Sequence, residues 1–311
     1  MNYRVLGKTG WQVTELSLGC ATHVVSWNEE EERNFVATVH RALELGVNFF
    51  DTSDSYRTEA WLAKALGNRR RDVYVATKVG KYAEWTRQPL SYAVPEHIYL
   101  CCDASLHRLR TDYIDLYFCH LDPPADVGVF IEAFEMLKRQ GKIRHYGVST
   151  NDAALLEAFN RTGECAACEM DYNILDRRAE LALLPYAEAH DIGTVVRRPL
   201  EKGILSGTMH PDMVFADWVR KRWNQGQQRA EYQDKVRRVE ALRFLESPDR
   251  TLVAAALQFL FANPAVSCAI PGASRPQRLD QYMQAYATRL TPAEIARIDA
   301  ITDPRVTRQP A

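Results

Sequence analysis

The sequence offers little that would place the protein in a membrane, in a secretory pathway or on a nucleic acid. None of its apolar runs is long enough to span a bilayer, and the first residues, MNYRVLGKTGWQV, lack the apolar stretch of a signal peptide. The formal net charge of −1 provides no field that would attract nucleic acid or anionic lipid. We therefore expect a cytoplasmic protein that engages neither membranes nor nucleic acids.

Cysteine and glycine patterns exclude further kinds of site. The seven cysteines are odd in number and scattered, which does not suit a disulfide framework. Cys165 and Cys168 form a CAAC sequence, but no second CxxC follows and the pair lies in a strand-like run. We therefore expect buried thiols there, rather than a metal or redox centre, and no bound metal. No GxGxxG follows the first predicted strand, which counts against a Rossmann domain.

The overall composition, 46% apolar and 25% charged, is that of an ordinary folded protein. The chain has no low-complexity linker and no strongly charged tail. Its 311 residues are long for one core unless the architecture is a sandwich or an α/β barrel, which often exceeds about 200 residues as one domain. We therefore expect residues 1–311 to form a single domain.

What the sequence does contain is a repeating pattern of a short apolar run, a polar tip and a longer segment with helical spacing. The apolar runs, which we predict to be strands, are 16–19, 47–51, 73–78, 113–120, 143–150, 165–173, 192–196 and 265–272. The predicted helices are one from near Asn28, one over 59–66, one from Pro95, one that carries Phe130, one capped by Asn151 or Asp152, and those over 179–190, 233–246, 249–261 and 276–287.

Near-continuous apolar strands that alternate with helices indicate a parallel sheet covered by helices. Eight strand-then-helix units in a chain of this length fit a (β/α)8 barrel better than a doubly wound sheet. Near the amino terminus, RVLG and QVTEL flank a turn, KTG, at residues 8–10. We therefore expect an α/β fold, a (β/α)8 TIM barrel with a short N-terminal β-hairpin.

Polar residues follow three successive predicted strands. Asp51 ends the second strand, and Tyr56 lies in the loop after it. Lys78 ends the third strand and His120 the fourth. The carboxyl ends of the strands build the active site in a (β/α)8 barrel, so we expect these four side chains at one rim.

The four side chains together would form a general acid. A free tyrosine has a pKa of about 10, too high for ready proton donation at neutral pH. We expect the Lys78 ammonium to lower the pKa of Tyr56, and Asp51 to keep the lysine charged and in place. His120 would polarise or orient a carbonyl oxygen. This set suits a carbonyl group that accepts a hydride.

The sequence resembles the aldo-keto reductase family over nearly the whole chain. The motifs that carry the resemblance occur in the family's order, and they are YRVLGKTGWQVTELSLG, NFFDTSDSY, VATKVG, SLHRLRTDYIDLYFCH, YGVS, DYNILDR, RPLEKGILSG and IPGASRPQRL. The resemblance implies a (β/α)8 barrel and NADPH-dependent reduction of aldehydes and ketones to alcohols, with the reverse oxidation possible. The family's catalytic tetrad falls on Asp51, Tyr56, Lys78 and His120.

The resemblance also places the nicotinamide, with departures from the family's pattern. The family holds the carboxamide with Ser-Asn after strand five and Gln at strand six, where this chain has Ser149, Thr150 and Glu169. Asn151 follows one residue late and is a candidate helix cap instead. Glu169 can accept from the carboxamide but cannot donate, and its charge would favour the positive ring of NADP⁺.

Two further segments correspond to the phosphate and adenosine sites. Arg197 and Arg198 stand near the family's aromatic stacking position, and would stack on the ring, reach the pyrophosphate or pair with Glu169. LEKGILSG resembles the loop at the pyrophosphate, and the arginines of SRPQR favour NADP(H) over NAD(H), which stays possible. The expected cofactor-binding residues are Gly19, Cys20, Asp51, Ser149, Thr150, Glu169, Arg197, Arg198, Leu200, Gly203, Ser274, Arg275, Arg278 and Gln281.

Substrate specificity lies in the loops, where the pattern is least informative. Trp27, Tyr82 and Trp85 are candidate apolar walls of a pocket, or else pack beneath the loops. The family commonly has glycine after the tyrosine, where a positive φ suits it, but this chain has Arg57, which either attracts an anionic substrate or points into solvent. The polar segment 209–232 would be a lid, an oligomer contact or a partly disordered loop.

These observations favour an NADP(H)-dependent oxidoreductase that acts on a small-molecule carbonyl or alcohol. A close variant would run as a dehydrogenase of sugars or cyclic alcohols. A different class is a cofactor-sensing regulatory or binding protein with slow residual reductase activity, which the departures at Thr150, Glu169 and Arg197 keep in view. A third is a pseudoenzyme that uses the barrel as a scaffold. The pattern does not indicate an oligomeric state.

Overall fold

A computed structural model of the chain describes residues 1–21, 28–81, 90–217 and 220–303. The contacts within the chain divide it into two units. Unit 1 comprises Met1–Asp171, Ala179–Arg197 and Pro264–Leu279, and unit 2 comprises Tyr172–Arg178, Arg198–Asn263 and Asp280–Ala311. The single domain expected from the sequence stays a prediction.

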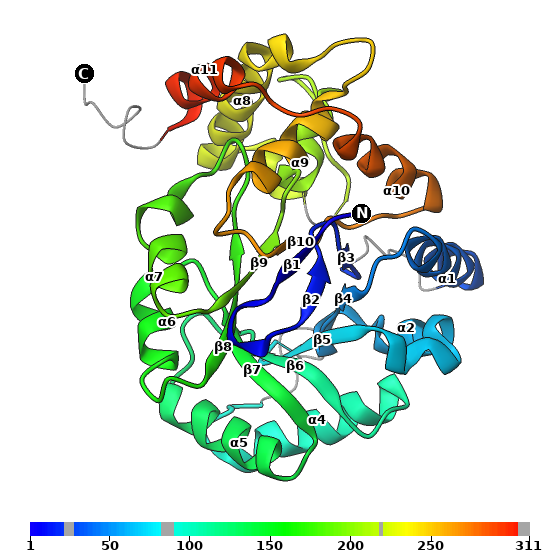
Figure 1. The fold of residues 1–311 in the computed structure, drawn as a ribbon, viewed down its shortest axis with the longest axis vertical. Coiled ribbons are helices and arrows are strands. Elements are labelled where there is room, and N and C mark those ends of the chain that lie inside the picture. The colour runs from blue at the N-terminus through cyan, green and yellow to red at the C-terminus, as the bar shows by residue number, and fades with distance from the viewer. Residues whose placement is uncertain (22–27, 82–89, 218–219, 304–311) are drawn as a thin grey trace. The chain divides into compact units, whose positions relative to one another are not determined.

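Unit 1 contains a parallel barrel. Within the described residues, eight strands pair in the order β10-β9-β8-β7-β6-β5-β4-β3. Parallel bridges from Leu16 to Ala269 and from Gly19 to Gly272 join the two ends of this sheet, so that it closes on itself (Figure 1). The strands are β3 (Leu18–Gly19), β4 (Phe49–Asp51), β5 (Tyr74–Val79), β6 (Ile114–Cys119), β7 (Ile143–Ser149), β8 (Cys165–Asp171), β9 (Gly193–Arg197) and β10 (Cys268–Ala269).

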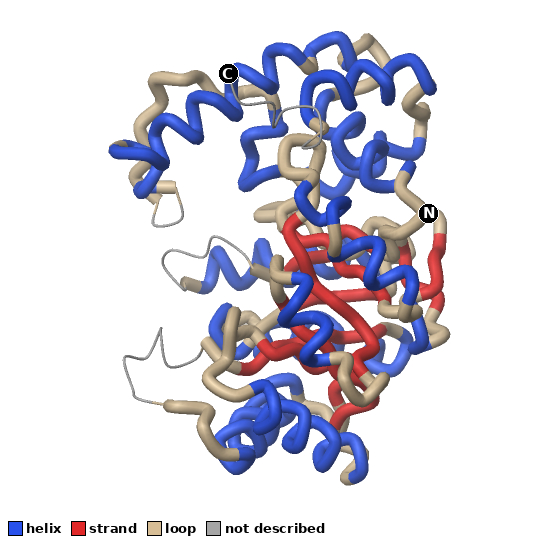
Figure 2. The backbone as a smooth tube through the Cα atoms, turned by 90° about the vertical axis from the view of Figure 1, so that its left-hand side faces the viewer, coloured by secondary structure: helices blue, strands red, loops and turns tan. Residues whose placement is uncertain are grey.

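Helices surround these strands, as the predicted alternation requires (Figure 2). The ends of two helices follow local sequence signals. Asn28 accepts the backbone N–H of Glu31 and so caps the helix that begins at Glu29. Pro95 is the first residue of the helix that ends at Leu109, where its missing N–H costs nothing. The helices of unit 1 are α1 (Glu29–Glu44), α2 (Glu59–Leu66), α4 (Pro95–Leu109), α5 (Val127–Arg139), α6 (Ala153–Phe159) and α7 (Leu183–Ala189). The arrangement confirms the predicted (β/α)8 barrel.

The N-terminal hairpin is also confirmed. β1 (Tyr3–Val5) and β2 (Gln12–Thr14) pair antiparallel around a 3-10 turn that ends at Gly10, whose φ is 69°. Leu6 is fully buried in a core that includes inward-facing residues of the barrel strands. Leu6 lies against Gly193, the first residue of β9, where a Cβ would come within 2.6 Å of Leu6 Cδ1. The Lys8 N–H also donates to Asp191 O, just before that strand, at 2.7 Å. The hairpin therefore fills the amino-terminal end of the barrel and leaves the carboxyl ends of the strands for a site.

Two predicted helices differ from their expected form, and for a third the structure decides between two candidate caps. The segment 179–190 is not one helix but a 3-10 turn, Arg178–Leu181, followed by α7. A helix continuous through both would place the Pro185 ring against the carbonyl of residue 181, whereas a start at Leu183 puts the proline in the first turn. Asp152 rather than Asn151 caps α6, by accepting the Ala154 N–H at 2.9 Å. The helix expected over 276–287 ends at Met283 as α10 (Pro276–Met283), and a 3-10 turn follows.

Unit 2 is mainly helical, with α8 (Gly226–Ala241), α9 (Leu252–Ala262) and α11 (Pro292–Thr302). The first of these begins seven residues before the expected start at 233. The last was not predicted, although Thr291 and Glu294 form a complete capping box at its start. The described part of the segment 209–232 packs around its own aromatic side chains, and the Trp223 and Tyr232 rings stack at 5.4 Å.

Candidate active site

The four residues of the predicted tetrad come together in unit 1. Asp51 is the last residue of β4, Lys78 lies near the end of β5, and His120 directly follows β6. Tyr56 ends a 3-10 turn, Asp54–Tyr56, that follows β4. The Lys78 Nζ lies 5.1 Å from the centre of the Tyr56 ring, and the Tyr56 and His120 rings meet edge to face at 5.9 Å.

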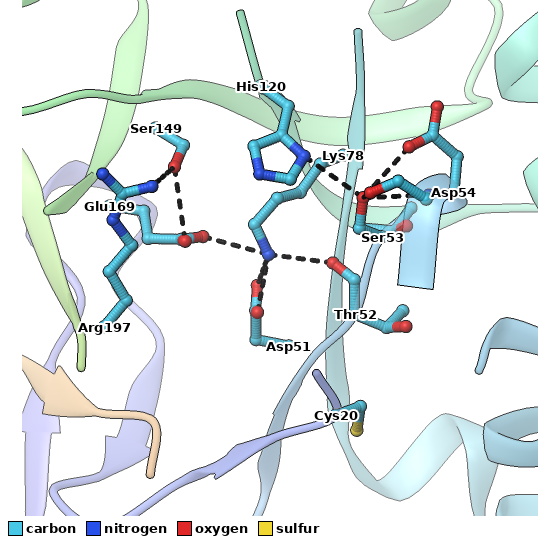
Figure 3. Close-up of polar contacts among 12 residues, drawn as sticks. Cys20, Asp51, Thr52, Ser53, Asp54, Lys78, His120, Ser149, Glu169 and Arg197 are labelled. Carbon is cyan, nitrogen blue, oxygen red and sulfur yellow. Dashed lines mark hydrogen bonds and ion pairs between the residues drawn. The ribbon is translucent and has the colours of Figure 1, made fainter. Parts of the chain in front are cut away.

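Lys78 is fully buried and is held by three groups. Its Nζ donates to Asp51 Oδ1 at 2.6 Å and to the Thr52 carbonyl at 2.9 Å, and it also contacts the second oxygen of Asp51. On its other side, Glu169 Oε2 lies at 3.1 Å and forms an ion pair (Figure 3). The sequence did not predict this second carboxylate partner, although Glu169 is in β8, paired with the last residue of β7.

The two carboxylates around Lys78 compete for one positive charge. Burial raises the pKa of Asp51 to about 8; Glu169 adds to the shift and Lys78 opposes it. Burial by itself would lower the pKa of the Lys78 ammonium, but Asp51 and Glu169 outweigh it, so its pKa lies above the ordinary value. Lys78 is therefore a fixed cation, while Asp51 retains a proton well above the usual range for aspartate.

The expectation that Lys78 lowers the pKa of Tyr56 holds in direction, but burial raises the pKa of the phenol by more, and Glu169 and Asp51 raise it further. The net result is a pKa above the ordinary value. The phenol is consequently protonated at neutral pH and holds the proton that a general acid would donate, and Lys78 makes that proton easier to release than burial alone would allow.

His120 is neutral under the same conditions. Burial lowers its pKa well below the ordinary value, and the positive charges of Lys81, Lys78 and Arg197 add to the shift. Its Nδ1 lies 3.2 Å from Ser53 Oγ, a contact that sequence reasoning missed. A neutral imidazole donates from one nitrogen and accepts at the other, so this contact bears on which nitrogen faces a ligand.

Glu169, Ser149 and Arg197 form a chain beside Lys78 (Figure 3). Arg197 Nη1 donates to Ser149 Oγ at 3.1 Å, and that hydroxyl donates to Glu169 Oε1 at 3.3 Å. The carboxylate paired with Arg197 is Asp171, at 2.8 Å, rather than Glu169. Asp171 is further held by Asn151, which therefore bridges β8 instead of capping the helix.

These residues fit the amide end of a nicotinamide cofactor in one specific respect. Glu169 Oε2 is buried and has no hydrogen-bond partner within the described residues, since its contact with Lys78 is an ion pair without hydrogen-bond geometry. Such an oxygen would accept an N–H₂ group. Ser274 and Arg275 directly precede α10, and Arg278 lies in its first turn, where phosphate is favoured.

Other predicted cofactor residues already use their polar groups inside the barrel. The Gly19 N–H donates to Pro271 O at 3.2 Å and the Cys20 N–H to Asp51 O at 2.7 Å. Thr150 is fully buried, and its hydroxyl donates to Asp122 at 2.7 Å. These three residues shape the ends of the strands, and their contact with a cofactor stays a prediction.

The remaining predicted cofactor residues lie in unit 2. Arg198, with φ 52°, and Leu200 lead into a 3-10 segment that contains Gly203, with φ 94°. The Gly203 N–H donates to the Leu200 carbonyl at 2.9 Å, so this amide serves the loop itself. Gln281 lies on α10. The cofactor role of this loop and of Gln281 likewise stays a prediction.

The candidate pocket residues Trp27, Tyr82 and Trp85 fall outside the described residues. Arg57 is exposed and has a φ of 59°, which confirms the positive φ expected at the position where the family commonly has glycine. A left-handed conformation is uncommon for arginine and turns the chain sharply after Tyr56.

The expected thiol and metal properties can also be compared with the structure. All seven cysteines, each of which lies in the described part of the chain, are buried and unbridged, as predicted for Cys165 and Cys168. Among the described residues, no three His, Cys, Asp or Glu side chains gather as a metal site would require. None of the described helices has the length and apolar character needed to cross a bilayer.

Comparison with known proteins identifies the family to which the chain belongs. The model of the aldo/keto reductase family matches residues 15–303. YqkF, an uncharacterised oxidoreductase of Bacillus subtilis, is 32% identical over 97% of both chains. An aldo-keto reductase structure from Bacillus halodurans in its holo form superposes with a TM-score of 0.80, 30% identity and 99% coverage of each chain. The glycerol dehydrogenase of Gluconobacter oxydans superposes with a TM-score of 0.82 at 26% identity, over 100% of this chain and 97% of that one. The chain therefore belongs to the aldo-keto reductase family, a family of oxidoreductases.

Proposed function

We propose that the protein is an NADP(H)-dependent oxidoreductase that reduces aldehydes or ketones to alcohols, with Tyr56 as the general acid. The observation that carries this proposal is the position of a protonated Tyr56 between two partners. One is Lys78, held as a cation by Asp51, and the other is His120, held neutral. The three groups come from neighbouring strands at the carboxyl end of the barrel, where such enzymes act.

In carbonyl reduction, each residue of the site would have its own role. The bound cofactor supplies the hydride that reaches the carbonyl carbon. As charge develops on the carbonyl oxygen, Tyr56 gives that oxygen its proton. The phenolate left behind is stabilised by the Lys78 ammonium, whose attraction for a buried anion is strong at low dielectric. Asp51 and the Thr52 carbonyl fix the lysine, so this stabilisation needs no rearrangement.

His120 would orient the same carbonyl oxygen. Its Nδ1 is occupied by Ser53, so Nε2 is the nitrogen left for a substrate. The low pKa of the imidazole means that it acts as a neutral hydrogen-bonding group and does not compete with Tyr56 as a cationic acid. The choice of NADP(H) rests on Arg275 and Arg278 with Ser274 at the start of α10, since paired guanidinium groups suit a 2′-phosphate.

A specific observation favours the reverse reaction as a second candidate. Glu169 forms an ion pair with the buried Lys78, so the site holds a carboxylate beside the expected position of the nicotinamide. A carboxylate there would stabilise the positive ring of NADP⁺ more than neutral NADPH, which would help alcohol oxidation. The similarity to a glycerol dehydrogenase is consistent with an alcohol substrate.

The decisive experiment compares wild type with Tyr56→Phe, using NADPH oxidation with 4-nitrobenzaldehyde as a reactive substrate. We expect turnover to fall by at least about 100-fold in the variant while NADPH binding survives, because only the acid is removed. Tyr3→Phe, at an exposed tyrosine, is the matched control and should behave as wild type. Equal activity in wild type and Tyr56→Phe would contradict the assignment of Tyr56 as the general acid. Tight NADPH binding without turnover in any variant would favour a cofactor-sensing protein.

A further inference from the structure

A buried chain of polar groups lies behind His120. Ser53 Oγ is 3.2 Å from His120 Nδ1, 3.0 Å from Asp54 Oδ1 and 3.0 Å from Ser55 Oγ (Figure 3). It also accepts the Ser55 backbone N–H at 3.2 Å. Ser53, Asp54 and His120 are at most 4% exposed, so water does not compete for these hydrogen bonds.

The Ser53 hydroxyl has a single proton, and this limits how the chain can be arranged. If Asp54 is ionised, its oxygen can only accept, and Ser53 donates to it. His120 must then donate from Nδ1 to Ser53 Oγ, which leaves Nε2 of the neutral ring without a proton. If Asp54 is protonated, it can donate to Ser53, and Ser53 can donate to Nδ1, so that Nε2 carries the proton. In both arrangements the Ser53 proton is already used, so Ser55 Oγ can only donate to Ser53.

We propose that Asp54, acting through Ser53, determines which nitrogen of His120 carries the proton. Both are positioning residues, since neither faces the reacting atoms. This inference rests on the proposed function in one respect: a proton on Nε2 is what allows His120 to donate to a carbonyl oxygen. The tautomer of His120 depends on these hydrogen bonds alone and can be observed without any substrate.

The surroundings of Asp54 favour the protonated form. Its Oδ2 is buried and has no hydrogen-bond partner within the described part of the chain, which is costly for an ionised carboxylate. Burial raises the pKa of Asp54 to about 7; Glu59 of α2 adds to this, while the hydrogen bonds from Ser53 and from the Ser55 backbone, and then Arg108 of α4, oppose it. Among the described residues, the Cys101 thiol and the Tyr117 phenol also interact with Asp54, and burial raises the pKa of each, so both stay neutral.

The surroundings of His120 keep its ring neutral while Asp54 titrates. Among the described residues, the positive charges of Lys81, Lys78 and Arg197 act on it, and all three lower its pKa beyond the effect of burial. The hydrogen-bond chain would therefore exchange one tautomer for another rather than charge the ring. Low pH would place the proton on Nε2, and high pH would place it on Nδ1.

The test is to determine the His120 tautomer in ¹⁵N-histidine-labelled protein by long-range ¹H–¹⁵N correlation, with His120→Gln to assign the resonances. From about pH 5.5 to about pH 8.5, we expect wild type to change from the Nε2–H to the Nδ1–H form, with a midpoint near the Asp54 pKa of about 7. Asp54→Asn should hold the Nε2–H form throughout, because its amide can donate to Ser53 at any pH. Asp212→Asn, at an exposed aspartate, should titrate as wild type does.

Ser53 provides a second, independent variant pair. Ser53→Ala should abolish the transition, and Ser53→Thr, which keeps a hydroxyl on an extended backbone, should restore it. A wild-type tautomer that does not change with pH would overturn the proposal, as would a transition that persists in Asp54→Asn or in Ser53→Ala. If Ser53→Ala does not fold, the Asp54→Asn spectra decide.

Activity separates this proposal from the proposed function. If both hold, kcat for carbonyl reduction should fall at least about tenfold in wild type over the tautomer transition and stay level in Asp54→Asn. A tautomer transition in a protein that reduces no carbonyl would support the hydrogen-bond chain and count against the reductase. An equal pH-dependent fall of kcat in wild type and in Asp54→Asn would overturn the role of Asp54.

Discussion

At the scale of single residues, the site is defined by which carboxylates surround Lys78. Glu169 occupies a position where the family has glutamine, and it adds a second carboxylate, 3.1 Å from the Lys78 Nζ. The sequence supplied this identity and its position within a strand. It could not supply the ion pair, because the reach of a glutamate depends on the register between β7 and β8 and on the depth of the lysine.

We predict that Glu169→Gln weakens the preference for NADP⁺ over NADPH. Glutamine keeps the size and the acceptor oxygen but removes the negative charge, an effect of at least about 1 kcal/mol, or about fivefold, for a charge several ångströms from the ring. The ratio of the Kd of NADP⁺ to that of NADPH, measured by calorimetry, should rise accordingly. An unchanged ratio would show that the charge of Glu169 is not felt by the ring.

The pKa of Asp51 leads to a prediction about stability. Its value of about 8 in the folded protein exceeds the ordinary 3.8, so the folded protein binds a proton that the unfolded chain releases over this range. That contribution to stability is complete at low pH and is lost as pH rises toward about 8. Relative to wild type, Asp51→Asn should therefore gain at least about 1 kcal/mol of unfolding free energy between about pH 5 and pH 8. Urea unfolding at each pH measures this difference, and a constant difference would contradict the shifted pKa.

At the scale of elements, the sequence predicted the type and order of the helices and strands better than the residues at which they begin and end. The barrel strands and α2 fall at their expected places because buried parallel strands read as continuous apolar runs. The split at Pro185 and the missed α11 have local causes that were present in the sequence. By contrast, the contact of Ser53 with His120 joins two loops far apart in the chain, and no local pattern encodes it.

The helix that the sequence reading missed provides a test of its own. Thr291 Oγ1 accepts the Glu294 N–H at 3.2 Å, and Glu294 accepts the Thr291 N–H at 2.8 Å. We predict that Thr291→Ala costs about 1 kcal/mol of unfolding free energy, because one end of the capping box is lost. Thr291→Ser retains the hydroxyl and should lose little or nothing, because serine caps helices at least as well as threonine. Equal losses in the two variants, measured by urea unfolding, would assign the effect to the methyl group instead.

At the scale of the whole molecule, the barrel depends on a close fit between its strands and the N-terminal hairpin. A Cβ on Gly193 would lie 2.6 Å from Leu6 Cδ1, closer than side chains pack. Sequence pattern predicted both the hairpin and the strand, but not that the two meet, since their contact spans most of the chain.

We predict that Gly193→Ala destabilises the protein by about 1 to 3 kcal/mol through overpacking. Leu6→Ala alone should cost about 2 to 5 kcal/mol, because it leaves a cavity. The double variant should be more stable than the sum of the two losses implies, since the smaller residue 6 makes room for the new methyl group. Strict additivity in a denaturation cycle would argue against the close approach.

The seven buried cysteines have a practical consequence. Burial raises the pKa of each thiol, so little thiolate is present in the folded chain to react with an alkylating reagent. Cys119, Cys168 and Cys268 lie on β6, β8 and β10, at separate positions around the barrel. The labelling rate of each thiol, followed by peptide mass spectrometry, would therefore report how often its own strand opens to solvent. The native cysteines are therefore built-in probes of local unfolding at separate places in the barrel.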